Sequence, residues 1–358
     1  MTDQRTEHAA ADDLVAAPDV DAPGRTTPGG PAPTTALATA TTQPSATANT
    51  PRSAQTADPT RPVEHADTGD DGFTPWRTPT EGTERAFVLA GGGATGIAWE
   101  AGVIIGLRDG GVDVREADTM IGTSAGSMVA AHVRLGTEET VAFERIREGA
   151  PLASYGRLGA ADATRYLRAQ LHLDARRGRA LVGRAALGAR TATEQEWLDT
   201  IGLGLVGQPW PQARLLVTAV DARTGTAVVF DRDSGVPLER AVAASCAVPG
   251  VFPAVEVGGR RYVDGGLRTI ANIDLAAGHR RVVALAPYPV GSHVRDLPPV
   301  QLRRLKPRAR TALVVPDARD LRAMGTNPLD MRRGERTFDA AREHGRRIAE
   351  RVGDVWHG

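Results

Sequence analysis

Short runs of apolar residues alternate with longer stretches of helical spacing along most of the chain. The first run is Ala86–Ala90 and the second lies at about 117–121, and each leads into glycines and then into a helical pattern. Strand, helix, strand and helix with short connections predict a mostly parallel sheet with helices on both faces. The pattern therefore indicates an α/β fold.

The second half of the chain continues this pattern with more short apolar runs. Asp221–Gly225 has turn chemistry between two of them, which predicts a hairpin. Helices are expected at about 237–245 and 334–352. The further strands are predicted at Arg214–Val220, Ala227–Phe230, Arg260–Val263, Val282–Ala286 and Ala312–Val315.

Two segments lack the strand pattern. Residues 1–82 are rich in Ala, Thr, Pro, Asp and Gly and have almost no large apolar side chains, so we expect a disordered tail before a catalytic domain at 83–358. The segment 138–205 is arginine-rich and helical, which predicts helices beside or over the sheet. The sequence does not decide whether that segment acts as a lid.

The composition excludes some classes of function and indicates a cellular compartment. The formal net charge is zero and no basic stripe carries interleaved aromatics, which argues against a nucleic-acid partner. The only lysine, Lys306, lies outside any phosphate-loop motif, and the single cysteine, Cys246, cannot form an intrachain disulfide. No apolar run reaches the about 18 residues of a membrane span. We expect a cytoplasmic protein, attached at most to the inner face of a membrane, and the sequence identifies no protein partner.

A serine stands between two glycines where the second predicted strand gives way to a helix. The motif is Gly-x-Ser-x-Gly, with Ser124 between Gly122 and Gly126. Such a turn holds the serine in a strained backbone conformation, and bulk at either glycine would collide with the neighbouring strand and helix. The turn also places the hydroxyl at a helix start, where unpaired amides can face a developing negative charge. Ser124 is therefore a candidate nucleophile.

Glycines also follow the first predicted strand, at Gly91, Gly92, Gly93 and Gly96. The spacing matches Gly-x-Gly-x-x-Gly, so a dinucleotide-binding Rossmann protein is one alternative. A Rossmann unit needs a second strand that ends in an acidic residue, however, and here the second strand ends in the serine turn. We therefore favour an oxyanion hole, in which uncovered glycine amides face a tetrahedral intermediate.

The serine needs a base, and the chain offers a histidine or an aspartate. Of the eight histidines, only His279 and His293 follow strand-like segments, and neither has glycine neighbours that would let it approach a serine closely. Asp264 ends a predicted strand and is followed by Gly265 and Gly266, which let its loop pack tightly. Enclosure in a poorly solvated pocket would raise the basicity of this carboxylate. We favour Asp264, and a histidine-triad esterase remains an alternative.

Together, the glycine run, the Gly-x-Ser-x-Gly turn and the Asp-Gly-Gly turn resemble the patatin-like phospholipase family in order and spacing, over about 85–350. The resemblance implies a patatin-like three-layer α/β/α fold with a mostly parallel central sheet. It implies Ser124 as nucleophile and Asp264 as proton acceptor in a two-residue dyad. It also implies an oxyanion hole at Gly91, Gly92 and Gly93.

The resemblance also has implications for the substrate, and the sequence departs from the family's pattern at one position. Ala244–Pro249 with Phe252–Pro253 also looks like the family's pattern, whereas Thr95 stands where the family often has Arg or Lys. The implied substrate is a lipid ester, phospholipid or acylglycerol, with transient contact to a membrane surface left open. No cofactor and no metal is needed, because amides would polarise the carbonyl. A non-catalytic lipid-binding protein of this fold remains the other alternative.

Overall fold

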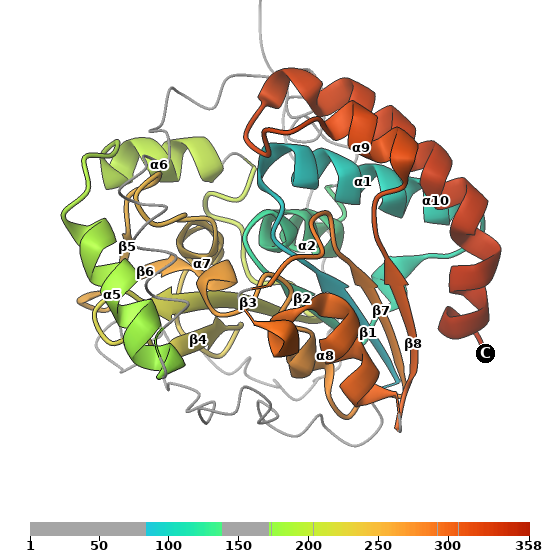
Figure 1. Cartoon of the computed structure of the whole chain (residues 1–358), viewed down its shortest axis with the longest axis horizontal. Coiled ribbons are helices and arrows are strands. Elements are labelled where there is room, and N and C mark those ends of the chain that lie inside the picture. Colours follow the sequence, from blue (N-terminus) through green and yellow to red (C-terminus); the bar gives the residue numbers. More distant parts are fainter. Residues whose placement is uncertain (1–83, 138–171, 173, 203, 292, 307) are drawn as a thin grey trace, which may run out of the picture. The chain divides into compact units, whose positions relative to one another are not determined.

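The computed structural model describes residues 84–137, 172, 174–202, 204–291, 293–306 and 308–358 (Figure 1). All of these residues belong to the unit Gln55–Gly358. The expected tail at 1–82 lies outside the described residues, as does 138–171 of the expected helical segment.

Within the described residues, eight strands form one sheet with the order β5-β6-β3-β2-β1-β7-β8, and β4 also pairs with β3. The pairs β1–β2, β1–β7, β2–β3 and β7–β8 are parallel, and those of β3 with β4, β3 with β6 and β5 with β6 are antiparallel. The mostly parallel sheet and the β3–β4 hairpin are thus confirmed. The strands are β1 (Arg85–Leu89), β2 (Thr119–Gly122), β3 (Arg214–Asp221), β4 (Ala227–Phe230), β5 (Val255–Val257), β6 (Arg260–Asp264), β7 (Arg281–Leu285) and β8 (Arg310–Val314).

Successive residues of the central strands face opposite sides of the sheet, and both sides are packed. On β1, Phe87 and Leu89 belong to one hydrophobic core, whereas Ala86 and Val88 belong to another. All four side chains are fully buried. Burial on both faces explains why the sequence shows continuous apolar runs and no alternation of apolar and polar residues.

Helices cover both faces of the sheet, as the sequence predicts (Figure 1). Residues of α1, α2 and α10 share the core of Phe87 and Leu89, and residues of α8 and η3 share the core of Val88. The three-layer α/β/α arrangement is therefore present. The helices of these two layers are α1 (Gly93–Asp109), α2 (Ala125–Leu135), α7 (Leu238–Ser245), α8 (Pro298–Leu305), α9 (Ala318–Met324), α10 (Gly334–Trp356) and the 3-10 turn η3 (Ile273–Ala276).

Two more helices lie in the described part of the segment 138–205. These are α5 (Ala175–Leu187) and α6 (Glu194–Ile201), and each buries one apolar face. Trp197 of α6 stacks on Phe252 with ring centroids 4.0 Å apart. The helical prediction holds for this part of the segment. Within the described ranges, no helix is both long enough and apolar enough to cross a bilayer.

Glycines let α1 and α10 approach closely. A Cβ on Gly106 would lie 2.1 Å from the Arg342 carbonyl oxygen, a distance that forces the two helices apart. We expect Gly106→Val to lower the free energy of unfolding by about 1–3 kcal/mol through overpacking. Urea unfolding followed by circular dichroism measures this loss. Gly188→Ala is the matched control, since its Cβ would meet only the Ala185 carbonyl oxygen, at 3.8 Å; equal losses in both variants would contradict the prediction.

Candidate active site

Ser124 lies between the end of β2 and the start of α2, in a strained backbone conformation. Its φ is 52° and its ψ is −124°. Among the described residues, only Ser124 and Asn272 combine a positive φ with a side chain other than glycine's. Such strain persists only where surrounding packing enforces it, and it is concentrated at functional sites. The backbone therefore has the geometry expected of a nucleophile elbow.

The two flanking glycines are required by close backbone contacts. A Cβ on Gly122 would lie 2.4 Å from the Cα of Ser127, and a Cβ on Gly126 would lie 2.3 Å from the Leu89 carbonyl oxygen. Both distances are far shorter than any tolerated contact. The helix α2 thus begins directly against the ends of β1 and β2, which fixes where the Ser124 side chain emerges.

The pairing of β3 with two other strands brings Asp264 to Ser124. Gly122, two residues before Ser124, is paired with Val217, and Asp264 is paired with Ala219. The Ser124 hydroxyl lies close enough to the Asp264 carboxylate to lower the pKa of that carboxyl. The Gly266 amide donates a hydrogen bond to Oδ1 of the same carboxylate at 2.7 Å. The two residues, 140 positions apart in the chain, meet in one site.

The Asp264 carboxyl has an unusually high pKa for an aspartate. Burial raises its pKa to about 7, and the hydrogen bonds from Ser124 and Gly266 oppose this rise. The cause is desolvation, which disfavours the charged form. A base with a pKa close to neutrality can both accept and return a proton at physiological pH. Asp264 therefore has the protonation behaviour of a general base.

The glycine run lies beside the serine, but its three amides are not equivalent. A Cβ on Gly91 would be 3.4 Å from the Ser124 Cβ, which places Gly91 next to the Ser124 side chain. The Gly91 amide, however, donates to the Ile270 carbonyl oxygen at 2.7 Å. Its N–H is thus engaged and not free to bind an oxyanion in this conformation. Within the described residues, the Gly92 and Gly93 amides have no such acceptor.

The backbone at Gly93 explains why the run ends in glycine. Gly93 has a φ of 60°, and a Cβ there would lie 2.8 Å from the Pro328 carbonyl oxygen. One turn later, the Gly96 amide donates to the Gly92 carbonyl oxygen at 2.9 Å, which closes the first turn of α1. The run therefore bends the chain sharply and starts the helix with uncovered amides.

Thr95, the departure from the family pattern, is fully buried and tethers two other segments. Its hydroxyl lies 3.0 Å from the Tyr288 hydroxyl and donates to the Pro328 carbonyl oxygen at 3.3 Å. Its amide donates to the same carbonyl oxygen at 3.0 Å. A threonine here thus holds the loops after β7 and after α9 against the glycine run, a role the sequence did not indicate.

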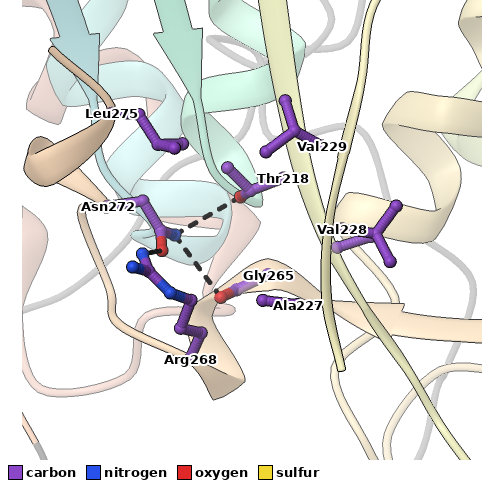
Figure 2. A pocket seen from close by; sticks show the side chains of 9 residues that line it. Thr218, Ala227, Val228, Val229, Gly265, Arg268, Asn272 and Leu275 are labelled. Carbon is purple, nitrogen blue, oxygen red and sulfur yellow. Dashed lines mark hydrogen bonds between the residues drawn. The ribbon is translucent and has the colours of Figure 1, made fainter. Parts of the chain in front are cut away.

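A buried polar network supports the Asp-Gly-Gly turn. Figure 2 shows Asn272 pointing toward Thr218 and the Gly265 carbonyl oxygen, with Arg268 beside it. The Asn272 side-chain amide also donates to the Thr123 hydroxyl at 3.0 Å, next to Ser124. Arg268 forms a buried ion pair with Asp274 and donates to Asn272 Oδ1 at 2.6 Å. A cavity of about 10 Å³, room for roughly one water molecule, lies between these residues and β4.

Other groups near the serine were missed by sequence reasoning. The Ser124 amide donates to the Ser245 hydroxyl oxygen at 2.9 Å, so this amide is occupied as well. The Ala125 amide, by contrast, has no acceptor among the described residues. The residue after the nucleophile commonly supplies an oxyanion donor in serine hydrolases. Because Ala125 directly follows Ser124, the sequence could have indicated its amide as an oxyanion donor. Nothing in the sequence, by contrast, connects Ser245 to Ser124.

The two candidate histidines do not meet the serine. His279 is buried, and its ring nitrogens contact the Ala276 carbonyl oxygen at 3.1 Å and the Thr119 hydroxyl at 3.0 Å. Thr119 is the first residue of β2, whereas Ser124 follows the last one, so His279 lies at the opposite end of that strand. His293 precedes a 3-10 turn, Val294–Asp296, and has no contact with Ser124 within the described structure. Neither is in place to act as the base.

One group of side chains has the composition of a metal site, away from the serine. Asp317, Asp320 and His344 place ligand atoms within 4.8 Å of one another. Asp320 Oδ2 already accepts hydrogen bonds from the Trp99 indole at 2.9 Å and from His344. Asp317 likewise accepts from Arg347 at 2.6 Å. Because N–H donors already occupy these oxygens, the group ties α9 and α10 to α1.

Comparison with known proteins places these features in a family. A profile of the family described as patatin-like phospholipase matches residues 87–277. Uncharacterized NTE family proteins of Mycobacterium bovis and Mycobacterium tuberculosis are each 31% identical over 214 residues, which is 58% of this chain and 30% of theirs. This chain therefore spans less than a third of the length of these relatives. VipD from Legionella pneumophila, a solved structure, is 12% identical, covers 79% of this chain and 70% of its own, and has a TM-score of 0.36.

The structural similarity to VipD is too low to support any conclusion about this chain. The family profile, by contrast, supports membership of the family. The matched range holds the glycine run, the serine turn and the Asp-Gly-Gly turn, and it covers more than half of the chain. The chain therefore belongs to the patatin-like phospholipase family.

Proposed function

We propose that this protein is a serine acyl hydrolase that cleaves the carboxylic esters of lipids, phospholipid or acylglycerol. The observation that carries the proposal is that β3 brings the strained Ser124 turn and the buried Asp264 carboxylate into one site. A hydroxyl is a weak nucleophile until an adjacent base accepts its proton. The pKa of Asp264, about 7, suits that role.

The proposed reaction proceeds in two halves. Ser124 Oγ attacks the ester carbonyl carbon as its proton passes to Asp264, and a tetrahedral oxyanion forms. Collapse of this intermediate breaks the ester bond, and the leaving alcohol takes the proton from Asp264. Water then attacks the acyl-enzyme, again losing a proton to Asp264. Breakdown of the second intermediate releases the fatty acid and returns the proton to Ser124.

The oxyanion donors we propose are the backbone amides of Gly92, Gly93 and Ala125. The sequence had suggested Gly91 in place of Ala125, but the Gly91 amide already donates to the Ile270 carbonyl oxygen. The amides of Gly92 and Gly93 lie at the start of α1, and that of Ala125 lies at the start of α2, where the helix dipoles also favour a negative charge. Each such donor contributes about 2.7–4 kcal/mol to transition-state stabilisation.

Family membership supports the lipid substrate, and it supports no finer assignment. The relatives are described only as uncharacterized NTE family proteins, and this chain spans 30% of their length. The substrates that we name for the whole protein are therefore proposed, and so is any contact with a membrane surface. Hydrolysis of phospholipid vesicles and of acylglycerol emulsions, compared side by side, distinguishes the two substrate classes.

A fluorophosphonate probe with mass spectrometry tests the proposal. We expect the probe to label the peptide that contains Ser124, and Ser124→Ala to abolish both labelling and ester hydrolysis. Ser234→Ala is the matched control, because Ser234 lies in the turn after β4 and, among the described residues, forms its hydrogen bonds only within that turn. Labelling of another residue, or full hydrolysis by Ser124→Ala, would contradict the proposal. A chain that binds lipid without any labelling would instead be a non-catalytic lipid-binding protein.

A further inference from the structure

The end of α7 contacts both members of the Ser124–Asp264 pair. The Ser245 hydroxyl oxygen accepts the backbone N–H of Ser124 at 2.9 Å. Two residues later, the Ala247 carbonyl oxygen accepts the backbone N–H of Asp264 at 3.0 Å. One short segment, Ser245–Ala247, is thus hydrogen-bonded to the backbone of each residue of the pair, although the two come from different strand ends.

This segment is itself held in place by packing. Ser245 is fully buried, and the four alanine and valine residues before it, Ala241–Ala244, are fully buried in the main core. On the other side of the turn, Ser127 Oγ donates to the Ser124 carbonyl oxygen at 2.7 Å and lies 3.8 Å from Cys246 Sγ. The Ser124 peptide is therefore bonded on both its N–H and its C=O, by side chains from two helices.

Strain explains why such bonding matters at this position. With a φ of 52° and a ψ of −124°, Ser124 would relax toward an ordinary conformation unless its neighbours prevented it. Its amide is also buried at a helix start, where no intrahelical acceptor exists. Without Ser245, the amide would lose its partner and the peptide would be free to rotate. Rotation would change where the hydroxyl points.

We propose that Ser245 is a positioning residue for the nucleophile. By binding the Ser124 amide, it holds the hydroxyl toward Asp264 and keeps that amide out of the set of oxyanion donors. Ala247 holds the Asp264 backbone from the same segment, so the end of α7 sets the separation of the two groups. This inference rests on the proposed function, because it assumes that Ser124 is the nucleophile.

Steady-state hydrolysis of a soluble short-chain ester tests the inference with Ser245→Ala, Ser245→Thr and the control Thr337→Val. Small misplacements of reacting groups cost up to about a hundredfold, so we expect kcat of Ser245→Ala to fall roughly tenfold to a hundredfold with KM unchanged. Ser245→Thr keeps the acceptor oxygen and should restore most of kcat. Thr337 on α10 is fully buried and its hydroxyl has no hydrogen-bond partner in the described part of the chain, so Thr337→Val should turn over like the wild type.

Several outcomes would overturn the inference. A wild-type kcat in Ser245→Ala would do so, as would an equal loss in Thr337→Val or a rise in KM alone. Where Ser245→Ala does not fold, Ser245→Cys keeps a similar volume with a weaker acceptor, and a wild-type kcat there overturns the inference as well. Full activity of Ser124→Ala would instead overturn the proposed function. An inactive Ser124→Ala together with a fully active Ser245→Ala would leave that function in place and remove only the role of Ser245.

Discussion

Asp264→Asn is expected to lower kcat/KM for ester hydrolysis by at least about 100-fold and by as much as about 10,000-fold, the range for loss of a general base. Asparagine has nearly the same shape and can still accept the Gly266 amide, but it cannot take the Ser124 proton. The wild type should also show a pH profile set by this carboxyl. Because only the ionised form is a base, activity should rise with pH and level off above about 7, where Asp264 is ionised.

A stability measurement separates this loss from misfolding. The pKa of Asp264 is raised in the folded state, so ionisation of the unfolded chain from about pH 4 upward favours unfolding until the folded carboxyl ionises near 7. Asp264→Asn escapes that penalty. We therefore expect a variant that is inactive and yet at least as stable as the wild type at pH 8. Fluorophosphonate labelling at the wild-type rate, or an acid limb that persists in the variant, would contradict the role of Asp264.

Glu100→Gln is expected to stabilise the protein by an amount that grows with pH. Glu100 on α1 is fully buried, and neither carboxylate oxygen has a hydrogen-bond partner among the residues that the structure describes. Burial raises the pKa of Glu100 well above its ordinary value, and the nearby Ala90 amide, which donates to the Leu285 carbonyl oxygen at 3.1 Å, opposes this rise. The folded protein therefore disfavours the charged form of this side chain.

The stabilisation by Glu100→Gln depends on pH because the folded and the unfolded chain bind the Glu100 proton with different affinity. Below about pH 4 both the folded and the unfolded chain carry the proton on Glu100, so the variant and the wild type should be equally stable. As pH rises, the unfolded chain ionises while the folded one does not, which costs the wild type about 1.4 kcal/mol per pH unit until the folded carboxyl also ionises. Glutamine has no such cost. Urea unfolding of both proteins at pH 5 and pH 8 measures the difference, and parallel stability curves would contradict it.

Local patterns were enough to predict most of the elements. The runs at Ala86–Ala90 and Val282–Ala286 coincide with β1 and β7 within one residue at each end, and the predicted helix at 237–245 is α7. These elements were visible because strands buried on both faces and amphipathic helices have distinct periodicities. The strand β5 was not predicted, since three residues are too few to show a period. The helices α8 and α9 were not predicted either.

The candidate site was predictable only as far as its chemistry lies in contiguous motifs. Gly-x-Ser-x-Gly and Asp-Gly-Gly are short, and the steric demands of a strained turn restrict what can occupy them. Such short motifs do not show which backbone amides are already hydrogen-bonded. Whether Gly91 donates to Ile270, or Ser124 to Ser245, depends on how segments more than 100 positions apart in the chain pack together. The hydrogen bonds of His279 to Ala276 and Thr119, which leave Asp264 as the base that we propose, depend on the same kind of contact.

By itself, the sequence determined the α/β order of elements, the strained serine turn and the family to which the motifs point, because each depends on neighbouring residues. Only the tertiary structure decided that β3 would pair with both β2 and β6, and so bring Asp264 to Ser124. Strand pairing and burial are long-range properties of the packed sheet. The same packing removes water from Asp264, and this desolvation raises the pKa of its carboxyl to about 7.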